Sequence, residues 1–311
     1  MTIQIKGNWH TKASMNQPRS HTPIIPHKGE LFIFGGGGPD FKSLQSTACY
    51  DPATNEWQEL TAMPTARSGT IGCKVGDKIY IIGGGFKQPD GMFRFLKTVE
   101  IYDPATDTWE QGPDMLMPHD YPGGLVFDDY IYILGGHHPD ATTSGPKTDP
   151  GFAFCERLNL KTNEWEQIAD LPTPRFALNA VNYEGRLLTM GGVAFTPEGF
   201  NNFTVIEEYL PESNSWQKLD DLELPWTAAG QGNCVTKDSL FIFGGYSGDG
   251  IHNRASYINS SNNEWQALPD IPAPRCAMGV AVMDNTIYLL GGWADDGRSP
   301  TEDFYAFEIS E

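Results

Sequence analysis

Short apolar segments that end in a pair of glycines recur six times along the chain. They read LFIFGG, IYIIGG, IYILGG, LLTMGG, LFIFGG and IYLLGG, and their second glycines are Gly36, Gly84, Gly136, Gly192, Gly245 and Gly292. β-Branched and aromatic residues fill these segments, which is typical of buried strands. A tryptophan recurs with the same spacing, at Trp9, Trp57, Trp109, Trp165, Trp216 and Trp265. A repeat of about 50 residues predicts a β-propeller in which each copy forms one blade.

Residues 63–109 show how one copy divides into strands. A proline-containing loop leads into the alternating segment SGTIGCKV, and the hairpin turn Gly76-Asp77 separates this segment from KIYII, which ends at the glycine pair. A longer loop, residues 85–97, precedes the segment TVEIYD, and a tight turn then leads to the strand that carries Trp109. Each copy is therefore expected to form four antiparallel strands, a to d.

The two ends of the chain complement each other. The last copy has a third strand, FYAFEI, but no fourth strand with a tryptophan, whereas residues 3–10 at the N-terminus supply a lone strand with Trp9. We expect this N-terminal strand to complete the last blade, because closure leaves no open sheet edge. The prediction is an all-β, six-bladed propeller that occupies residues 1–311 as a single domain.

Composition fits this fold and narrows the partners. The chain has 34 Gly and 23 Pro, as many tight turns require, and a net charge of −19, which argues against general binding of nucleic acid or anionic membranes. No apolar run approaches the ~18 residues of a membrane span, and the N-terminus lacks the pattern of a signal peptide. Its five cysteines show no C-x-x-C spacing and are expected to be buried thiols. These features predict a cytoplasmic protein.

The repeat resembles the kelch repeat family: an apolar strand with Gly-Gly, a tyrosine about seven residues before the tryptophan, then Pro and Arg. The tyrosine–tryptophan pairs are Tyr50/Trp57, Tyr102/Trp109, Tyr209/Trp216 and, with one extra residue, Tyr257/Trp265, while Leu158 replaces the tyrosine in another copy. The resemblance covers essentially the whole chain. It implies the fold but not one activity, since kelch propellers include peptide-binding adaptors, oxidases and sugar isomerases. The motif of the family's iron-dependent members is missing from this sequence, and we expect no metal and no cofactor.

Candidate site residues come from the loops on one face of the propeller. The d–a loops should place one residue per blade at the mouth of the central channel: Arg19, Arg67, His119, Arg175, Trp226 and Arg275. The b–c loops should join them on this face and add Arg94, Arg254 and Arg298. Arginine offers a fixed fork of donors that suits a carboxylate. The alternative is that these arginines bridge neighbouring loops or backbone carbonyls, and both interpretations stay open.

Two blades depart from the arginine pattern. The third has His119, followed by Asp120 and Tyr121, and the fifth has Trp226; these changes indicate a titratable group and an aromatic platform, or neutral drift. The longest b–c loop begins at His137-His138. A mixed set of possible metal ligands occurs there and nearby, namely His119, Asp120, His137, His138, Asp140 and Asp149. A solvated polar loop is the interpretation we favour.

The sequence therefore predicts a binding module that captures an acidic ligand, either a carboxylate-bearing peptide or a small organic acid, at an arginine-lined channel mouth. The alternative is an isomerase or mutarotase acting on an acidic sugar, similar to the kelch-type sialic acid epimerases. In that case His119 or a loop carboxylate would move the proton. A third possibility is an interaction protein that uses its acidic face. The oligomeric state is left open.

Overall fold

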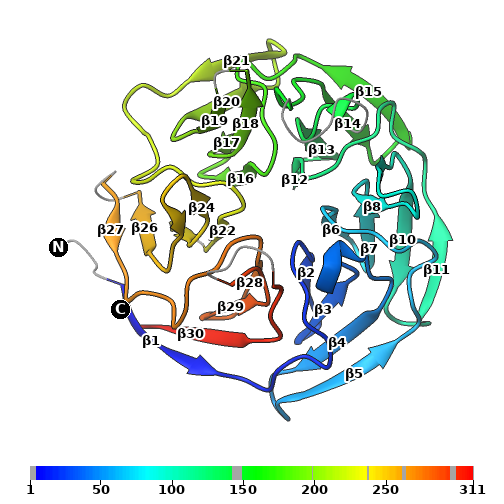
Figure 1. Ribbon diagram of the computed structural model, residues 1–311, viewed down its shortest axis with the longest axis vertical. Coiled ribbons are helices and arrows are strands. Elements are labelled where there is room, and N and C mark those ends of the chain that lie inside the picture. Colours follow the sequence, from blue (N-terminus) through cyan, green and yellow to red (C-terminus); the bar gives the residue numbers. More distant parts are fainter. Residues whose placement is uncertain are drawn as a thin grey trace.

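Six four-stranded antiparallel sheets stand around a central axis and form a closed ring (Figure 1). The structure is a computed structural model, which describes residues 5–141, 149–197, 199–236, 238–260, 264–294 and 299–310. The predicted six-bladed propeller with four strands per blade is confirmed. Among the described residues, no helix is long and apolar enough to cross a membrane.

Strands a to d run outward from the axis in each blade. The first blade contains β2 (Ile24–His27), β3 (Glu30–Phe34), β4 (Thr47–Asp51) and β5 (Glu56–Leu60). The second contains β6 (Ile71–Val75), β7 (Lys78–Ile82), β10 (Val99–Asp103) and β11 (Thr108–Gln111). The third contains β12 (Gly123–Phe127), β13 (Tyr130–Leu134), β14 (Cys155–Asn159) and β15 (Glu164–Ile168).

The remaining three blades repeat this order. The fourth contains β16 (Asn179–Tyr183), β17 (Arg186–Met190), β20 (Ile206–Leu210) and β21 (Ser215–Lys218). The fifth contains β22 (Gly232–Val235), β23 (Ser239–Phe243), β26 (Ala255–Asn259) and β27 (Gln266–Ala267). The sixth contains β28 (Gly279–Met283), β29 (Thr286–Leu290), β30 (Phe304–Ser310) and β1 (Lys6–Thr11).

Short elements decorate the b–c loops. Three of these loops form small hairpins: β8 (Gly85–Lys87) with β9 (Phe93–Phe95), β18 (Val193–Thr196) with β19 (Gly199–Asn202), and β24 (Tyr246–Ser247) with β25 (Gly250–Ile251). The first b–c loop contains the 3₁₀ turn η1 (Pro39–Phe41). These loops and the d–a loops lie together, as isolated bridges such as Ser68 to Gly85 show. We call this side of the propeller the loop face.

The ring closes as the sequence predicts. β1 pairs antiparallel with β30 and places Trp9 opposite Phe307, so the N-terminal strand is the outermost strand of the last blade (Figure 1). The strand runs from Lys6 to Thr11 rather than over residues 3–10, and residues 1–4 lie outside the described part of the chain. Backbone pairing thus joins the two ends of the sequence.

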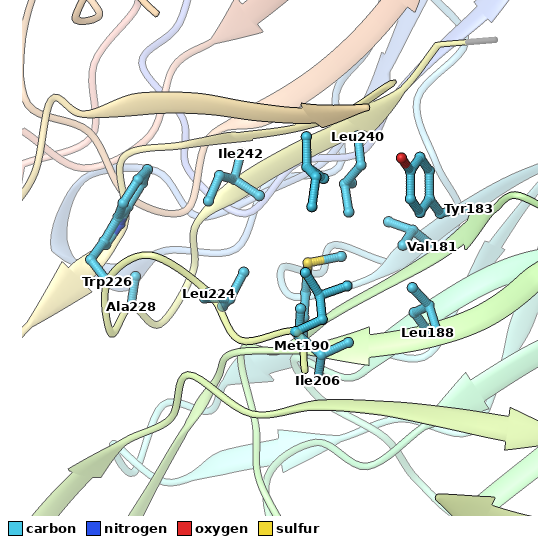
Figure 2. Packing of buried hydrophobic residues seen from close by; sticks show 12 residues of the cluster. Val181, Tyr183, Leu188, Met190, Ile206, Leu224, Trp226, Ala228, Leu240 and Ile242 are labelled. Atoms are coloured by element: carbon cyan, nitrogen blue, oxygen red, sulfur yellow. The ribbon is translucent and has the colours of Figure 1, made fainter. Parts of the chain in front are cut away.

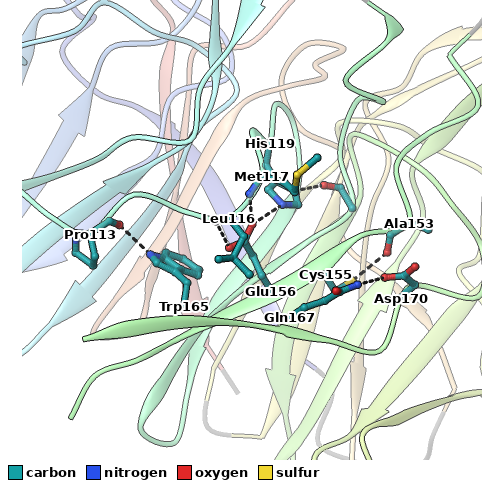
Figure 3. A network of polar contacts seen from close by, with 11 residues as sticks. Pro113, Leu116, Met117, His119, Ala153, Cys155, Glu156, Trp165, Gln167 and Asp170 are labelled. Carbon is teal, nitrogen blue, oxygen red and sulfur yellow. Dashed lines mark hydrogen bonds and ion pairs between the residues drawn. The ribbon is translucent and has the colours of Figure 1, made fainter. Parts of the chain in front are cut away.

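Each repeated tryptophan joins its blade to the preceding one. The indole N–H of Trp109 donates to the carbonyl of Thr61 at 2.9 Å, and that of Trp165 donates to Pro113 at 2.8 Å (Figure 3). The other four repeated tryptophans make the same kind of bond, at 2.8 to 3.0 Å. The repeated tryptophan therefore has a structural role as a tie between neighbouring blades.

The glycine pairs sit where adjacent blades crowd near the axis. Gly83 has a φ of +64°, and a Cβ on it would lie 2.6 Å from the carbonyl oxygen of His119 in the next blade. The N–H of Gly84 donates to that same oxygen at 2.7 Å. Only glycine combines this backbone conformation with so close an approach, so the Gly-Gly pair is the joint between neighbouring blades.

Apolar side chains fill the spaces between blades. Between the fourth and fifth blades, Leu188 and Met190 face Leu240 and Ile242, and Trp226 lies at one end of the cluster (Figure 2). Corresponding clusters lie between the other blades. All five cysteines are buried and free, as expected, and burial raises the pKa of the Cys73 thiol to about 12.

Candidate functional site

A closed ring of backbone hydrogen bonds surrounds the channel mouth on the loop face. One d–a loop residue per blade has a φ of +51° to +66°, and we call this set the mouth ring: His21, Gly69, Tyr121, Ala177, Gly230 and Ala277. Each of these residues donates its N–H to the carbonyl of the mouth-ring residue in the preceding blade, at 2.6 to 3.3 Å. The bond from His21 to Ala277 completes the circle. The sequence did not predict this ring.

A cavity of about 320 Å³ lies on the axis beside the mouth ring, lined by the first residues of all six inner strands. The rings of His21 and Tyr121 meet edge to face at its mouth, with centroids 4.3 Å apart. Gly69 leaves room for this contact, because a Cβ there would lie 2.8 Å from the Tyr121 ring. Burial, with a smaller effect of nearby His137, lowers the pKa of His21 to about 3, so this imidazole is neutral at physiological pH.

The six predicted site residues lie beneath the mouth, and their side chains are at most 8% exposed. Their donor groups make hydrogen bonds to backbone carbonyls: Arg19 donates to the carbonyl of Gly35 at 2.9 Å, and Arg67 donates to that of Gly83 at 3.2 Å. The fifth blade differs, since Trp226 lies two residues before the equivalent backbone position. Its indole N–H nevertheless donates to the matching glycine carbonyl, that of Gly244, at 3.0 Å.

Carboxylates pair with four of these groups inside their own blades. Arg67 pairs with Glu100 at 2.6 Å, Arg175 pairs with Glu207 at 2.6 Å, and Arg275 pairs with Asp303. His119 Nε2 lies 3.1 Å from Glu156, which also accepts the backbone N–H groups of Leu116 and Met117 (Figure 3). Within the described ranges, no hydrogen bond or ion pair joins two of the six residues. Their direct contact with a ligand, and a catalytic role of His119, stay predictions.

A cluster of titratable side chains lies on the loop face of the third blade. His137 Nδ1 makes a hydrogen bond with the carboxylate of Asp149, which also accepts the N–H groups of His138 and Gly151 at 3.1 Å. The His137 ring stacks on Phe176, with centroids 3.9 Å apart. Although burial acts in the opposite direction, these hydrogen bonds lower the pKa of Asp149 below its ordinary value.

Asp120 completes this cluster from the d–a loop. Its carboxyl is 2% exposed, and burial together with the negative charge of Asp149 raises its pKa well above the ordinary value. The site thus holds a carboxyl group of raised pKa beside a carboxylate that orients an imidazole. Alignment of the six repeats could have found this cluster. In each blade the residue after the Gly-Gly pair bonds to a d–a loop residue. Only the third blade has titratable side chains at both positions, namely His137 and Asp120.

The metal-ligand set weighed from the sequence does not assemble. In the part of the chain that the structure describes, no three histidine, cysteine, aspartate or glutamate side chains are grouped to hold a metal ion. His138 Nδ1 lies 3.8 Å from a carboxylate oxygen of Asp140. Both ring nitrogens of His119 make hydrogen bonds, one with Glu156 and one with the carbonyl of Gly135.

Aromatic side chains form a continuous row across the loop face. Successive ring centroids lie 3.9 to 5.9 Å apart along this aromatic band, which consists of Phe41, Trp293, His21, Tyr121, His137, Phe176, Phe195, Phe200 and Tyr246. Its two ends are open to solvent, with Phe41 45% exposed and Tyr246 38% exposed. Arg94 and Arg254 stand exposed on the b–c loops of the second and fifth blades, whereas Arg298 lies outside the described residues.

The repeated Gly-Gly joints, the tryptophan bonds and the six closed blades define the class of protein. The family model of the KLHDC2/KLHL20/DRC7 Kelch-repeats domain matches residues 6–192 and 123–311. The chain belongs to the kelch repeat family. The solved structure of YjhT superposes with a TM-score of 0.76 over 96% of this chain and 99% of that one, at 16% identity, which shows the shared fold.

Two curated relatives illustrate the family's range. Kelch-like protein 23 of Homo sapiens is 24% identical over 82% of this chain and 42% of its own length, so the chain spans about two fifths of that protein. Kelch-like protein terF of Aspergillus terreus is 24% identical over 98% of this chain and 68% of its own length.

Proposed function

We propose that this kelch propeller is a protein-binding module that holds an acidic peptide with apolar side chains across the aromatic band. The observation that supports this most is the distribution of exposed apolar groups. Of the five large hydrophobic side chains exposed among the described residues, four stand on b–c loops of the loop face: Phe41, Met92, Phe93 and Tyr246. An aromatic row with solvent-exposed ends on a rigid scaffold is typical of a binding surface.

The preference for acidic residues rests on the cations beside the band. Lys42, Lys87, Arg94 and Arg254 are exposed, and no ion pair of theirs occurs in the described ranges. Lys87 also lies over the Phe41 ring at 6.0 Å. Exposed carboxylates share these loops, so recognition would come from local pairing of arginine with a carboxylate rather than from a uniform field.

The six buried groups would support this surface from below. Each of them joins its d–a loop to the core of its own blade, and together they fix the floor on which the aromatic band lies. A small organic acid at the mouth would need at least one of these groups to change partners.

The test is a binding assay with three fluorescent peptides that have leucine and phenylalanine at the same positions. The residues between these positions are aspartate and glutamate in the first peptide, lysine in the second and serine in the third. We expect the acidic peptide to bind best, and the double variant Phe41→Ala/Tyr246→Ala to weaken it by about 30-fold, as loss of an interface hot spot does. Leu116→Ala, which removes an exposed leucine outside the band, is the matched control. Equal binding of all three peptides, or binding unchanged in the double variant, would refute the proposal.

A second candidate function follows from the third-blade cluster. Asp120, whose carboxyl has a raised pKa, and the carboxylate–imidazole pair of Asp149 with His137 would supply the two proton-transfer partners that an isomerase or mutarotase needs. An acidic sugar is the substrate class in this proposal. NMR of anomer exchange for acidic sugars should show acceleration by the wild-type protein and its loss in Asp149→Asn. If the folded wild-type protein accelerates the anomer exchange of no acidic sugar, this second function is refuted and only the binding function remains.

A further inference from the structure

The third strand of each blade has one position that faces the d–a loop arginine. Strand register defines it: Glu100 pairs with Ile81, Glu156 with Ile133, Glu207 with Thr189 and, in the first blade, Ala48 with Ile33. The second, third and fourth blades therefore carry glutamate at this position. The first blade carries alanine.

Arg19 is consequently a buried cation without its usual partner. Its side chain is only 3% exposed, and it donates to the carbonyl of Gly35 at 2.9 Å and to Ser46 Oγ at 3.0 Å. Among the residues that the structure describes, no carboxylate oxygen lies within 4.0 Å of its guanidinium. Burial lowers its pKa to about 10, against an opposing effect of the Glu59 charge. An uncompensated buried charge is costly, so this group favours an anion.

Empty space adjoins this guanidinium. A cavity of about 260 Å³ is lined by Arg19 together with Met15, Asn16, Gln17, Ile33, Ser46, Thr47, Ala48, Trp57 and Glu59. It lies at the seam of the ring, because the segment 12–19 carries the chain from β1 of the last blade to the first blade. The cavity is many times the ~30 Å³ share of one water molecule. It also has an apolar wall formed by Ile33, Ala48 and Trp57.

We propose that this cavity binds a small carboxylate anion, which takes the place at Arg19 of the glutamate side chain that Ala48 lacks. Replacement of glutamate by alanine removes a CH₂–COO⁻ unit, and acetate has the same two heavy-atom groups. The carboxylate accepts hydrogen bonds from the guanidinium, and the apolar wall covers the short carbon chain. Glu59 stands at the rim as the competing partner from within the chain.

The cavity shares no lining residue with the aromatic band, and the proposal does not depend on the proposed function. Its occupant would contact both the segment that leaves the last blade and the strands of the first. Because only the closed ring contains the cavity, the anion would bind the native state alone and stabilise it by mass action.

The test compares thermal unfolding in sodium acetate and in sodium chloride at equal ionic strength. We expect the melting temperature of the wild-type protein to rise with the logarithm of acetate concentration beyond any rise in chloride. Ala48→Glu should melt higher in chloride, since it forms the ion pair internally, and should lose the acetate-specific response. Glu100→Ala is the matched variant: it recreates the same vacancy at Arg67 and should gain a further acetate-specific response.

Direct binding is measured by line broadening of ¹³C-carboxyl-labelled acetate in NMR. Broadening is expected with wild-type protein and should disappear in Ala48→Glu and in Ala48→Leu, which fills the cavity without a charge, so the test survives if one variant fails to fold. Acetate broadening unchanged in either folded variant would overturn the proposal. A second result would also overturn the proposal: the wild-type protein shows no acetate-specific response, and Glu59→Gln gains one. Glu59 would then already neutralise Arg19 in the wild-type protein.

Discussion

Replacement of Glu207 by glutamine should destabilise the protein severely, although the two side chains have the same shape. Arg175 and Glu207 are 0% and 2% exposed, and their charged atoms lie 2.6 Å apart. The change leaves the guanidinium buried, where it donates to the carbonyl of Thr173 and the hydroxyl of Thr189 but has no counter-charge. Removal of one partner of a buried ion pair costs about 3–5 kcal/mol, and we expect about 3 kcal/mol here because the amide still accepts one hydrogen bond.

The apolar double variant Arg175→Met/Glu207→Leu separates the cost of the lost charge from the loss of packing. An apolar pair of similar volume often replaces a buried ion pair without loss of stability. The fifth blade has no such ion pair: Ser256 occupies the position that corresponds to Glu207, and Trp226 donates to the glycine carbonyl in place of an arginine. We therefore expect the double variant to recover most of the stability lost in Glu207→Gln.

The assay is urea unfolding followed by tryptophan fluorescence, with Glu212→Gln in the same blade as the exposed control for loss of one carboxylate. The control should change the free energy of unfolding by less than about 0.5 kcal/mol. A loss below about 1 kcal/mol for Glu207→Gln, or a double variant no more stable than the single one, would show that the buried pair is not what neutralises Arg175.

Two further predictions concern the loop face and the blade joints. The raised pKa of Asp120 means that the folded protein holds this proton more tightly than the unfolded chain, so stability should fall as the pH rises above about 4 and toward the folded-state pKa. Asp120→Asn should flatten that fall in thermal melts between pH 4 and pH 8, and a variant curve parallel to the wild type would refute this origin. Gly244→Ala should cost more than about 2 kcal/mol, because its φ is +55° and a Cβ would lie 2.1 Å from a carbonyl oxygen of the next blade. Gly248→Ala, with open space around the new Cβ, should be nearly neutral in the same chemical denaturation assay.

The fold was predictable because its determinants are local and repeated. The Gly-Gly pairs and the tryptophans each mark a contact that every blade must make. The strand around Trp9 had no partner in its own repeat, and the last blade was the one that lacked a fourth strand. Six copies of one signal leave little choice of architecture. The strand ends differed by only a few residues.

The candidate site was harder to predict because its chemistry depends on which residues meet across loops. The sequence shows Arg67 and Arg175 at the d–a loops. Their charges are neutralised by Glu100 and Glu207, which lie on the third strand of the same blade. That pairing depends on strand register. His21 and Tyr121 were likewise missed as a contact, because they belong to the first and third blades and meet only over Gly69.

The mouth ring has a mechanical consequence. Its six hydrogen bonds run head to tail without a free end, so no blade can swing outward without breaking the bonds on both of its sides. Bonds in such a circuit polarise one another, and the loss of one weakens the rest. The mouth therefore keeps a fixed circumference, like a hoop around a barrel. In the proposed binding mode a peptide would lie on top of the ring rather than pass through it, and changes in the loops above could alter selectivity while the ring stays the same.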